Sequence, residues 1–325
     1  MKRTISILGS ILLLSSSLWA RPLFAADSVR SDLNQGHADA ALQKLSAALA
    51  QNPADAEAHN LRCRVYYQEE LWDQAIPDCE AAVRANPSSS EYHLWLGRAY
   101  GQKAAHASLI SAYKLAKKVA AEFQQAVQLD PQNTQALADL GEFDVSAPSI
   151  VGGGVSRAQV LAPKLQAVDA AAGFNLQAKI AEATKDYGTA ESNLKFAIAH
   201  SSTAASAWVD LAGFYRRRGR MSEMVSALHN GTSLDHQHSA VLVDAADNLT
   251  AAHLEPQTAI HWLQQYLAAE SLSEDAPAFA VRAKLARLLA DEGDTSEAQR
   301  QLAAARSMAS GYRIPARAFS SVAAR

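Results

Sequence analysis

Apolar and polar residues alternate along this chain in short blocks that have the spacing of amphipathic helices. Two of these blocks, Ala56–Tyr67 and Trp72–Ala85, are separated by a polar break at Gln68–Glu70. Apolar residues three and four positions apart share one face of a helix. We therefore predict two helices joined by a short turn. Such a hairpin cannot bury its apolar face alone and needs neighbouring hairpins to cover it.

The hairpin recurs along the chain at a constant spacing. Three pairs of identical residues lie 34 positions apart: Pro53 and Pro87, Ala41 and Ala75, and Ala48 and Ala82. We expect small residues such as Ala75 and Ala82 where the two helices of a hairpin approach most closely. A period of this length predicts one continuous array of stacked hairpins, although the length of the chain alone would suggest two domains.

One segment, which begins at Ala205, carries the clearest copy of the repeat. Its regularly placed residues are Trp208, Leu211, Ala212 and Tyr215 in the first helix, Gly219 at the turn, and Leu228 and Gly231 in the second helix. This pattern resembles the tetratricopeptide repeat, and the resemblance covers nearly all of residues 27–310. It implies an all-α fold, a right-handed superhelical solenoid of about eight helix-turn-helix repeats over residues 26–310. The concave groove of such a solenoid is expected to be lined mainly by first helices.

Two consecutive units depart from the period. The first has an insertion near residues 103–118, and Lys103–Gln128 is predicted to form one long helix with Lys114, Lys117 and Lys118 on its exposed part. The second has an insertion at residues 146–154, between its paired helices. Insertions in solenoids commonly form loops on one face, often the binding face.

The two ends of the chain differ from the repeats. Residues 1–25 combine Lys2 and Arg3 with an apolar stretch over residues 5–18 and a small residue, Ala20 or Ala25, before a cleavage point. This is the pattern of a secretory signal peptide, with an uncleaved anchor as the alternative. We therefore expect export to the periplasm or cell envelope, and no membrane span in the mature chain. Residues 311–325 are expected to form a C-terminal tail or a cap on the last hairpin.

Composition narrows the function classes. The chain is 49% hydrophobic but only 7% aromatic, so its apolar residues are mostly small ones that favour helices. The formal net charge of −3 argues against a nucleic-acid partner, which would need a basic face. Two cysteines are too few for a disulfide framework or a cysteine-based zinc site.

The two cysteines, Cys63 and Cys79, fall in the paired helices of one unit at core-facing positions. Antiparallel packing brings these levels of the two helices near each other. In an oxidising compartment the pair could form a disulfide that closes a short loop, worth about 3 kcal/mol by chain entropy. The alternative is two small buried thiols, and the sequence leaves both open.

The segment Gly152–Gly154 could hold an anion with free backbone amides at a helix start, assisted by Arg157. No Gly-Lys-Ser/Thr sequence follows it, so it is not a nucleotide P-loop. The alternative is a flexible connection. The His-x-His spacing in Asp235–His238 lacks a third ligand, and the chain contains no recognisable catalytic motif. We therefore predict no catalytic residues, no cofactor and no metal site.

The densest charge run contains Arg216, Arg217, Arg218 and Arg220, near the end of a first helix. Its positive charge either balances the negative end of the helix dipole or offers a basic contact to an acidic partner segment. Repeat phase predicts further contact residues on inner positions of first helices. The complete set is Asn60, Arg64, Tyr67, Arg98, Glu142, Lys179, Arg216, Arg217 and Arg287.

The leading hypothesis is a non-enzymatic protein–protein interaction scaffold that binds a peptide or protein segment in its groove. The alternative is an enzyme, or a protein that binds a small ligand or anion, at the glycine-rich loop of residues 146–157 and the adjacent long helix. A third possibility is self-association, because the end units of a solenoid stack readily.

Overall fold

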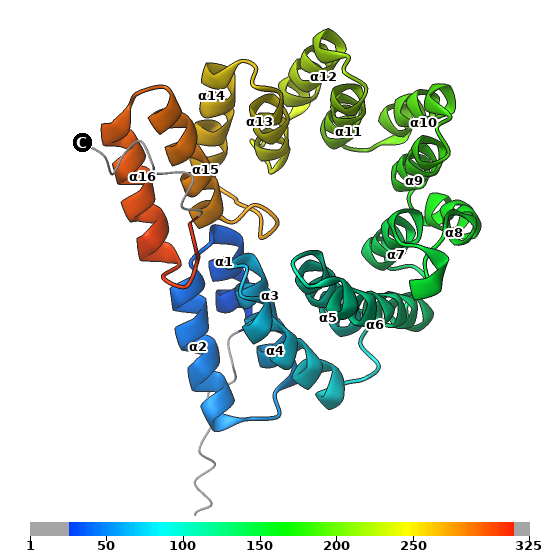
Figure 1. Ribbon diagram of the computed structural model, residues 1–325. Coiled ribbons are helices and arrows are strands. Elements are labelled where there is room, and N and C mark those ends of the chain that lie inside the picture. Colours follow the sequence, from blue (N-terminus) through cyan, green and yellow to red (C-terminus); the bar gives the residue numbers. More distant parts are fainter. Residues whose placement is uncertain (1–25, 315–325) are drawn as a thin grey trace, which may run out of the picture.

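The structure, a computed structural model, describes residues 26–314, which form sixteen α-helices and one 3-10 helix, η1 (Figure 1). The elements are α1 (Ala26–Gln35), α2 (Ala38–Gln51), α3 (Ala56–Gln68), α4 (Trp72–Ala85), α5 (Ser90–Ala105), α6 (Leu109–Leu129), α7 (Thr134–Ser146), η1 (Ser149–Val151), α8 (Val155–Val168), α9 (Ala170–Ala183), α10 (Tyr187–His200), α11 (Ala204–Arg217), α12 (Met221–Leu234), α13 (Val241–Ala252), α14 (Pro256–Leu267), α15 (Ala278–Asp291) and α16 (Thr295–Met308).

Consecutive helices pair into eight hairpins, α1 with α2 through α15 with α16. The odd-numbered first helices face inward and the even-numbered second helices form the outer layer (Figure 1). Each hairpin buries its apolar face against the next one, as the repeat pattern requires. The prediction of an all-α solenoid of about eight helical repeats is confirmed.

Four of the first helices, α3, α5, α7 and α9, begin at polar residues that accept hydrogen bonds from backbone amides. The Asp55 carboxylate accepts from the Ala58 amide at 3.0 Å, and the Ser89 hydroxyl, 34 positions later, accepts from the Tyr92 amide at 3.3 Å. Asn133 starts α7 in the same way, at 3.0 Å from the Ala136 amide. Each cap satisfies an amide that has no partner within its helix. The sequence therefore sets the helix starts locally.

Small residues allow the helices to approach closely, as the sequence predicts. Ala75 and Ala82 are completely buried in α4. At Gly231, in α12, a Cβ atom would lie only 2.8 Å from the Ala205 carbonyl oxygen of α11. Only glycine fits this crossing without displacing the backbone of the neighbouring helix.

The first insertion differs from the single long helix expected over Lys103–Gln128. The chain leaves the helix at His106–Ser108, so α5 and α6 are two separate helices. His106 stacks on Trp72 with ring centroids 4.4 Å apart, which holds the break against the preceding hairpin. The second insertion forms η1, which packs against α6, with Gly152 beside Ala120.

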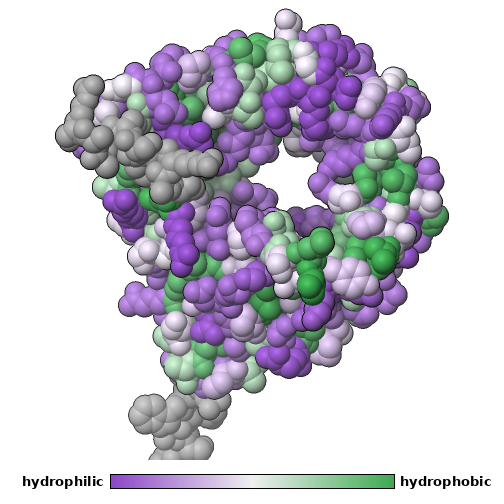
Figure 2. All heavy atoms as spheres, in the orientation of Figure 1, coloured by the Kyte–Doolittle hydropathy of each residue, from purple (hydrophilic) through white to green (hydrophobic). Residues whose placement is uncertain are grey.

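The array closes into a ring. Its first two hairpins share one apolar cluster with the last. In this cluster α1 contributes Leu33, α2 contributes Leu45, α3 contributes Leu61, and α15 contributes the completely buried Phe279. Figure 1 shows α16 and α15 beside α2 and α1, and Figure 2 shows that side chains leave the middle of the ring open. The open groove expected from the sequence is therefore an enclosed lumen. The end hairpins cover each other, which removes the free ends on which the idea of end-to-end stacking rested.

Polar contacts hold the same junction, which we call the seam. The Arg64 guanidinium bonds to the Glu274 carboxylate at 2.5 Å across a separation of 210 residues. The Gln68 amide nitrogen donates to the carbonyl oxygens of both Leu33 and Glu274. Gly36 has φ +72° and lies so close to the last hairpin that a Cβ atom would be 2.5 Å from the Ala278 nitrogen. A larger residue there would meet backbone on the other side of the seam.

The start of the C-terminal tail also belongs to the seam. The Ser310 amide and hydroxyl donate to the Asp39 carboxylate, and the Gly311 amide donates to the Glu69 carboxylate at 3.1 Å. The Tyr312 ring packs on Phe279 with centroids 4.9 Å apart. Residues 310–312 therefore contact the first, second and last hairpins, while the rest of the tail, 315–325, lies outside the described residues.

The signal-peptide prediction for residues 1–25 also lies outside the described residues. Within residues 26–314, no helix has the length and apolar character needed to cross a membrane.

Candidate binding site in the ring lumen

The lumen consists of connected hollows lined mainly by first helices. A cavity of about 690 Å³ lies between α7, α9, α11 and α13, and it shares Glu142, Lys179 and Asp210 with a neighbouring cavity of about 590 Å³. It also shares Asp244 with a third cavity of about 390 Å³, which reaches the seam. The first helices therefore line one continuous hollow, as the resemblance implied.

The structure distributes the expected contact residues unevenly. Six of them line the lumen cavities: Arg64, Tyr67, Glu142, Lys179, Arg216 and Arg217. Asn60 is completely buried, so it has no surface to offer a partner. Arg287 is exposed, faces Asp291 of its own helix and lines none of the three cavities.

Arg98, with Arg64, encloses Trp95 in a rigid cluster at one side of the lumen. The guanidinium groups of Arg64 and Arg98 lie 4.9 and 4.8 Å from the Trp95 ring centroid. The Tyr67 ring meets Trp95 edge to face at 5.5 Å. The Arg98 Nε also donates to the Asp139 carboxylate at 2.6 Å. These arginines are therefore committed to partners within the fold.

The remaining lumen cations are also largely neutralised. The Lys179 ammonium lies 2.7 Å from the Glu142 carboxylate, and Arg217 makes two 2.9 Å hydrogen bonds to Glu182. Arg216 donates to the Asn248 side-chain oxygen at 3.0 Å. Of the arginine run, Arg217 is therefore paired with a carboxylate of an adjacent first helix, whereas Arg216 contacts only a neutral amide and keeps its positive charge.

The other two members of the run lie away from the lumen cavities. The Arg218 guanidinium sits 3.7 Å from the Tyr187 ring centroid, and Arg220 pairs with Glu191 and Glu223. Arg220 thereby joins the turn before α12 to α10.

The lumen instead has an excess of carboxylates that the sequence reasoning missed. Asp210 accepts a hydrogen bond from Asn175 but pairs with no cation, and among residues 26–314 no hydrogen bond or ion pair reaches the carboxylates of Asp244 and Asp275. Asp247, by contrast, is paired with Lys284. Asp210, Asp244 and Asp275 therefore face one hollow without a direct ion pair among the described residues, although Lys179 and Arg217 act on Asp210, and Lys284 on Asp244, through space.

The surroundings of these carboxylates disfavour their charge. Loss of solvent within the lumen, together with the charge of Asp247, raises the pKa of Asp244 to about 6. Desolvation also raises the pKa of Asp210, against the opposing effect of Lys179. A cation from outside would relieve this cost, because it would supply the missing partner. Asp210 and Asp244 are 34 residues apart, so their matching positions were a signal in the sequence.

The glycine-rich loop does not present the free amides that the anion hypothesis required. The amides of Gly152, Gly153 and Gly154 donate to the carbonyl oxygens of Ser149, Pro148 and Asp144. The nearby Arg157 guanidinium lies 3.4 Å from the buried Asp144 carboxylate. The three glycine amides are therefore satisfied within the loop and are not available to an anion.

The loop and α6 meet, as expected for insertions in consecutive units, but the surface groove beside them is mainly apolar. It is lined by residues that include Val127, Val160 and Leu161. Nothing in this groove supports the small-ligand or enzymatic alternative.

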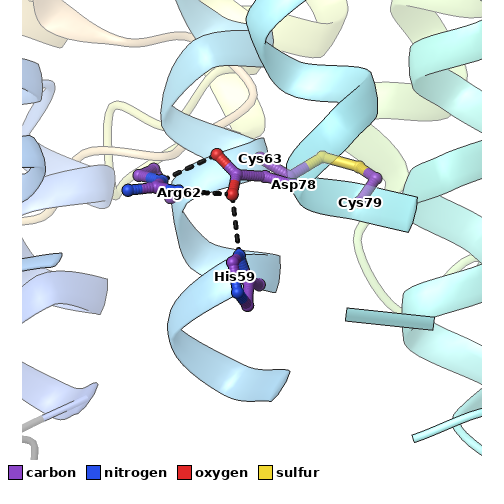
Figure 3. Close-up of a disulfide and its surroundings, with 5 residues drawn as sticks. All are labelled: His59, Arg62, Cys63, Asp78 and Cys79. Atoms are coloured by element: carbon purple, nitrogen blue, oxygen red, sulfur yellow. Dashed lines mark hydrogen bonds and ion pairs between the residues drawn. A yellow bond between two sulfur atoms is a disulfide. The ribbon is translucent and has the colours of Figure 1, made fainter. Parts of the chain in front are cut away.

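Cys63 and Cys79 form a disulfide between α3 and α4, with Cα atoms 5.3 Å apart (Figure 3). Beside it, the buried Asp78 carboxylate accepts two 2.7 Å hydrogen bonds from Arg62 and lies 2.7 Å from the His59 ring. All these groups join the two helices of one hairpin. Their arrangement is structural.

Across residues 26–314, no group of three or more histidine, cysteine, aspartate and glutamate side chains is placed to hold a metal ion. The two histidines of Asp235–His238 lie in the connection between α12 and α13.

The first third of the described chain is similar in sequence to a known family. A family model described as "Tetratricopeptide repeat" matches residues 27–90 and 62–119, which include α3, α4 and α5. No curated protein matches the chain in sequence.

Several solved structures resemble the chain, and one of them, yeast Tom70, shares its fold beyond the matched residues. Yeast Tom70 superposes with a TM-score of 0.54 and 13% sequence identity, over 93% of this chain and 63% of the Tom70 chain. A thermophilic TPR protein from Thermus thermophilus has 18% identity and a TM-score of 0.45, over 70% of this chain and 100% of its own. A tetratricopeptide repeat protein from Parabacteroides merdae has 12% identity and a TM-score of 0.48, over 75% and 91%.

At 13% identity the Tom70 comparison concerns the fold alone. The sequence match to the tetratricopeptide repeat covers residues 27–119, and the likeness to Tom70 shows that a similar fold continues along most of the chain.

Proposed function

We propose that this protein is a non-enzymatic scaffold whose ring lumen binds an extended protein segment that carries lysine or arginine. The observation that carries this proposal is the set of lumen carboxylates, Asp210, Asp244 and Asp275, which form no direct ion pair within residues 26–314. First helices of a solenoid present side chains at regular spacing, which suits an extended segment.

The chemistry of the lumen favours a cationic segment over an acidic one. The lumen arginines and Lys179 already face carboxylates, aromatic rings or amides. An acidic segment would have to displace these contacts, whereas a basic segment would pair with carboxylates that are still free. Charge-assisted hydrogen bonds in a partly desolvated hollow are among the stronger contacts between side chains.

The test uses isosteric removal of charge. The double variant Asp210→Asn with Asp244→Asn should weaken binding of a fluorescein-labelled Lys-Ser repeat peptide by about tenfold or more, as measured by fluorescence anisotropy. A Glu-Ser repeat peptide should bind neither protein. The matched control, Asp27→Asn with Glu270→Gln, changes two exposed acids outside the three lumen cavities and should bind like wild type.

Equal affinity of the lumen variant and the control would contradict a role for the lumen carboxylates. Tighter binding of the Glu-Ser peptide would overturn the predicted partner chemistry.

We further propose that the protein acts in the periplasm or cell envelope after removal of the N-terminal segment. This rests on Lys2 and Arg3, followed by the apolar stretch and the small residues Ala20 and Ala25. Cell fractionation with N-terminal sequencing of the isolated protein tests it. A cytosolic protein that begins at Met1 would contradict it.

A further inference from the structure

The first part of α6 projects beyond the helices around it. α6 has 21 residues, whereas α4, α8 and α10 each have 14. Its buried residues begin only at Val119, so none of its first ten residues is buried. At 1.5 Å per residue, the seven additional residues extend the helix by roughly 10 Å.

The projecting end is apolar. Leu109 and Ile110, at the tip, are 88% and 74% exposed, and Tyr113, one turn further along, is 38% exposed. Leu109 and Ile110 have the largest exposed fractions among the large hydrophobic residues that are exposed within residues 26–314. Contiguous exposed apolar side chains of this kind are typical of an interaction site.

The charge behind the tip is positive. Lys114, Lys117 and Lys118 follow it along α6 and are all exposed, and no acidic residue occurs between Lys103 and Glu122 in the sequence. Lys118 lies 3.7 Å from the Glu80 carboxylate of α4, so Lys114 and Lys117 carry the charge nearest the tip. Lys117 lies over the Tyr113 ring at 4.7 Å, which leaves its charge near the tip. Since the whole chain carries a net charge of −3, this segment is a local exception.

We propose that the start of α6 is a wedge that docks the ring on an anionic lipid surface. The order of side chains along the helix matches the layers of a membrane interface. Leu109 and Ile110 would enter the edge of the hydrocarbon, Tyr113 lies about 5 Å behind them at the depth preferred by tyrosine, and the three lysines follow at the level of the phosphates.

This order favours a lipid surface over an acidic protein partner. Anionic headgroups complement the lysines, and the amides at the start of α6 add the positive end of a helix dipole. Such a contact needs no membrane span, and it leaves the lumen unoccupied. The wedge is therefore independent of the proposed lumen function.

The experiment measures flotation of the protein, from which residues 1–25 have been removed, with vesicles. Wild type should float with phosphatidylcholine vesicles containing 30% phosphatidylglycerol, and should not float with pure phosphatidylcholine. Leu109→Ser with Ile110→Ser should reduce the partition coefficient by about tenfold or more. Replacement of Lys114, Lys117 and Lys118 by glutamine should reduce it by about fivefold for each lysine, and added salt should weaken wild-type binding.

Matched controls separate the wedge from general surface effects. Val160→Ser with Leu234→Ser removes two other exposed apolar side chains, and Lys164→Gln, Lys185→Gln and Arg306→Gln removes three other exposed cations. Both controls should float like wild type. Failure of wild type to bind the anionic vesicles, or equal losses in wedge and control variants, would overturn the proposal. A concentration-dependent dimer lost only in the Leu109 and Ile110 variant, without vesicle binding, would identify the wedge as a self-association surface instead.

Discussion

Truncation of Phe279 should open the ring. Phe279 is completely buried in the apolar cluster that the first and last hairpins share, and it packs on Tyr312. It therefore supplies the largest apolar contact across the seam. The variant Phe279→Ala keeps α15 helical, because alanine favours helices, but removes this contact.

The expected cost follows from the burial of the ring. Replacing a buried phenylalanine by alanine destabilises proteins by about 3–5 kcal/mol. If this cost falls on the closed form, the ratio of closed to open rings decreases by about two to four orders of magnitude. The polar seam contacts of Arg64 and Gln68 remain, and each contributes only about 1–3 kcal/mol.

Small-angle X-ray scattering and hydrogen exchange measure this opening. The radius of gyration should increase in Phe279→Ala, and the amides of α1 should exchange faster than in wild type. The control is Leu285→Ala in the same helix, since Leu285 is buried in the cluster formed with α11 to α14, away from the seam. It should lower the melting temperature while the radius of gyration stays at the wild-type value. Identical scattering and identical α1 exchange in both variants would refute the role of Phe279 in closure.

Three further predictions concern individual groups. Burial, together with the charge of Asp39, raises the pKa of Glu69 from 4.5 to about 7, so the folded form retains a proton that the unfolded chain has lost. The contribution of Glu69 to the free energy of unfolding should therefore decrease as pH rises from about 4.5 to about 7, and should stay constant above that. In thermal melts, Glu69→Gln should lack this part of the pH dependence. An equal pH dependence in both proteins would contradict a raised pKa at Glu69. Reduction of the disulfide between Cys63 and Cys79 should lower stability by about 3 kcal/mol in urea titrations, and two reactive thiols in unfolded, unreduced protein would disprove the bond. Gly231→Ala should lower the melting temperature, because the new Cβ would meet the Ala205 carbonyl oxygen. The control Gly188→Ala lies at an open helical position and should raise the melting temperature slightly. A higher melting temperature in Gly231→Ala would show that α11 and α12 can separate without cost.

The local architecture could be predicted from the sequence. Helix starts at Asp55 and Ser89 follow from side-chain caps, and the period of 34 follows from small and large residues that recur at fixed levels of each hairpin. A disulfide between Cys63 and Cys79 could also be considered from the sequence, because both cysteines lie within one hairpin. The caps and the disulfide depend on residues within one repeat, and the period depends on residues one repeat apart.

Some contacts between residues about one repeat apart could also have been predicted from the sequence. Arg217 bonds to Glu182, which lies 35 residues earlier, and Asp210 and Asp244 are 34 residues apart. A separation near the repeat length places two residues on adjacent first helices. The pairing of Arg217 and the row of lumen carboxylates could therefore have been predicted by comparing charges at this spacing.

Only the tertiary structure decided that the array closes. Arg64 and Glu274 are 210 residues apart, and no periodicity predicts that they meet. Closure depends on a small rotation between neighbouring hairpins, which sums over eight of them, so a slight change in packing at each step would separate the ends. The sequence specifies each hairpin through contacts between near neighbours. Whether the first and last hairpins share a core is decided by the accumulated geometry of the whole array.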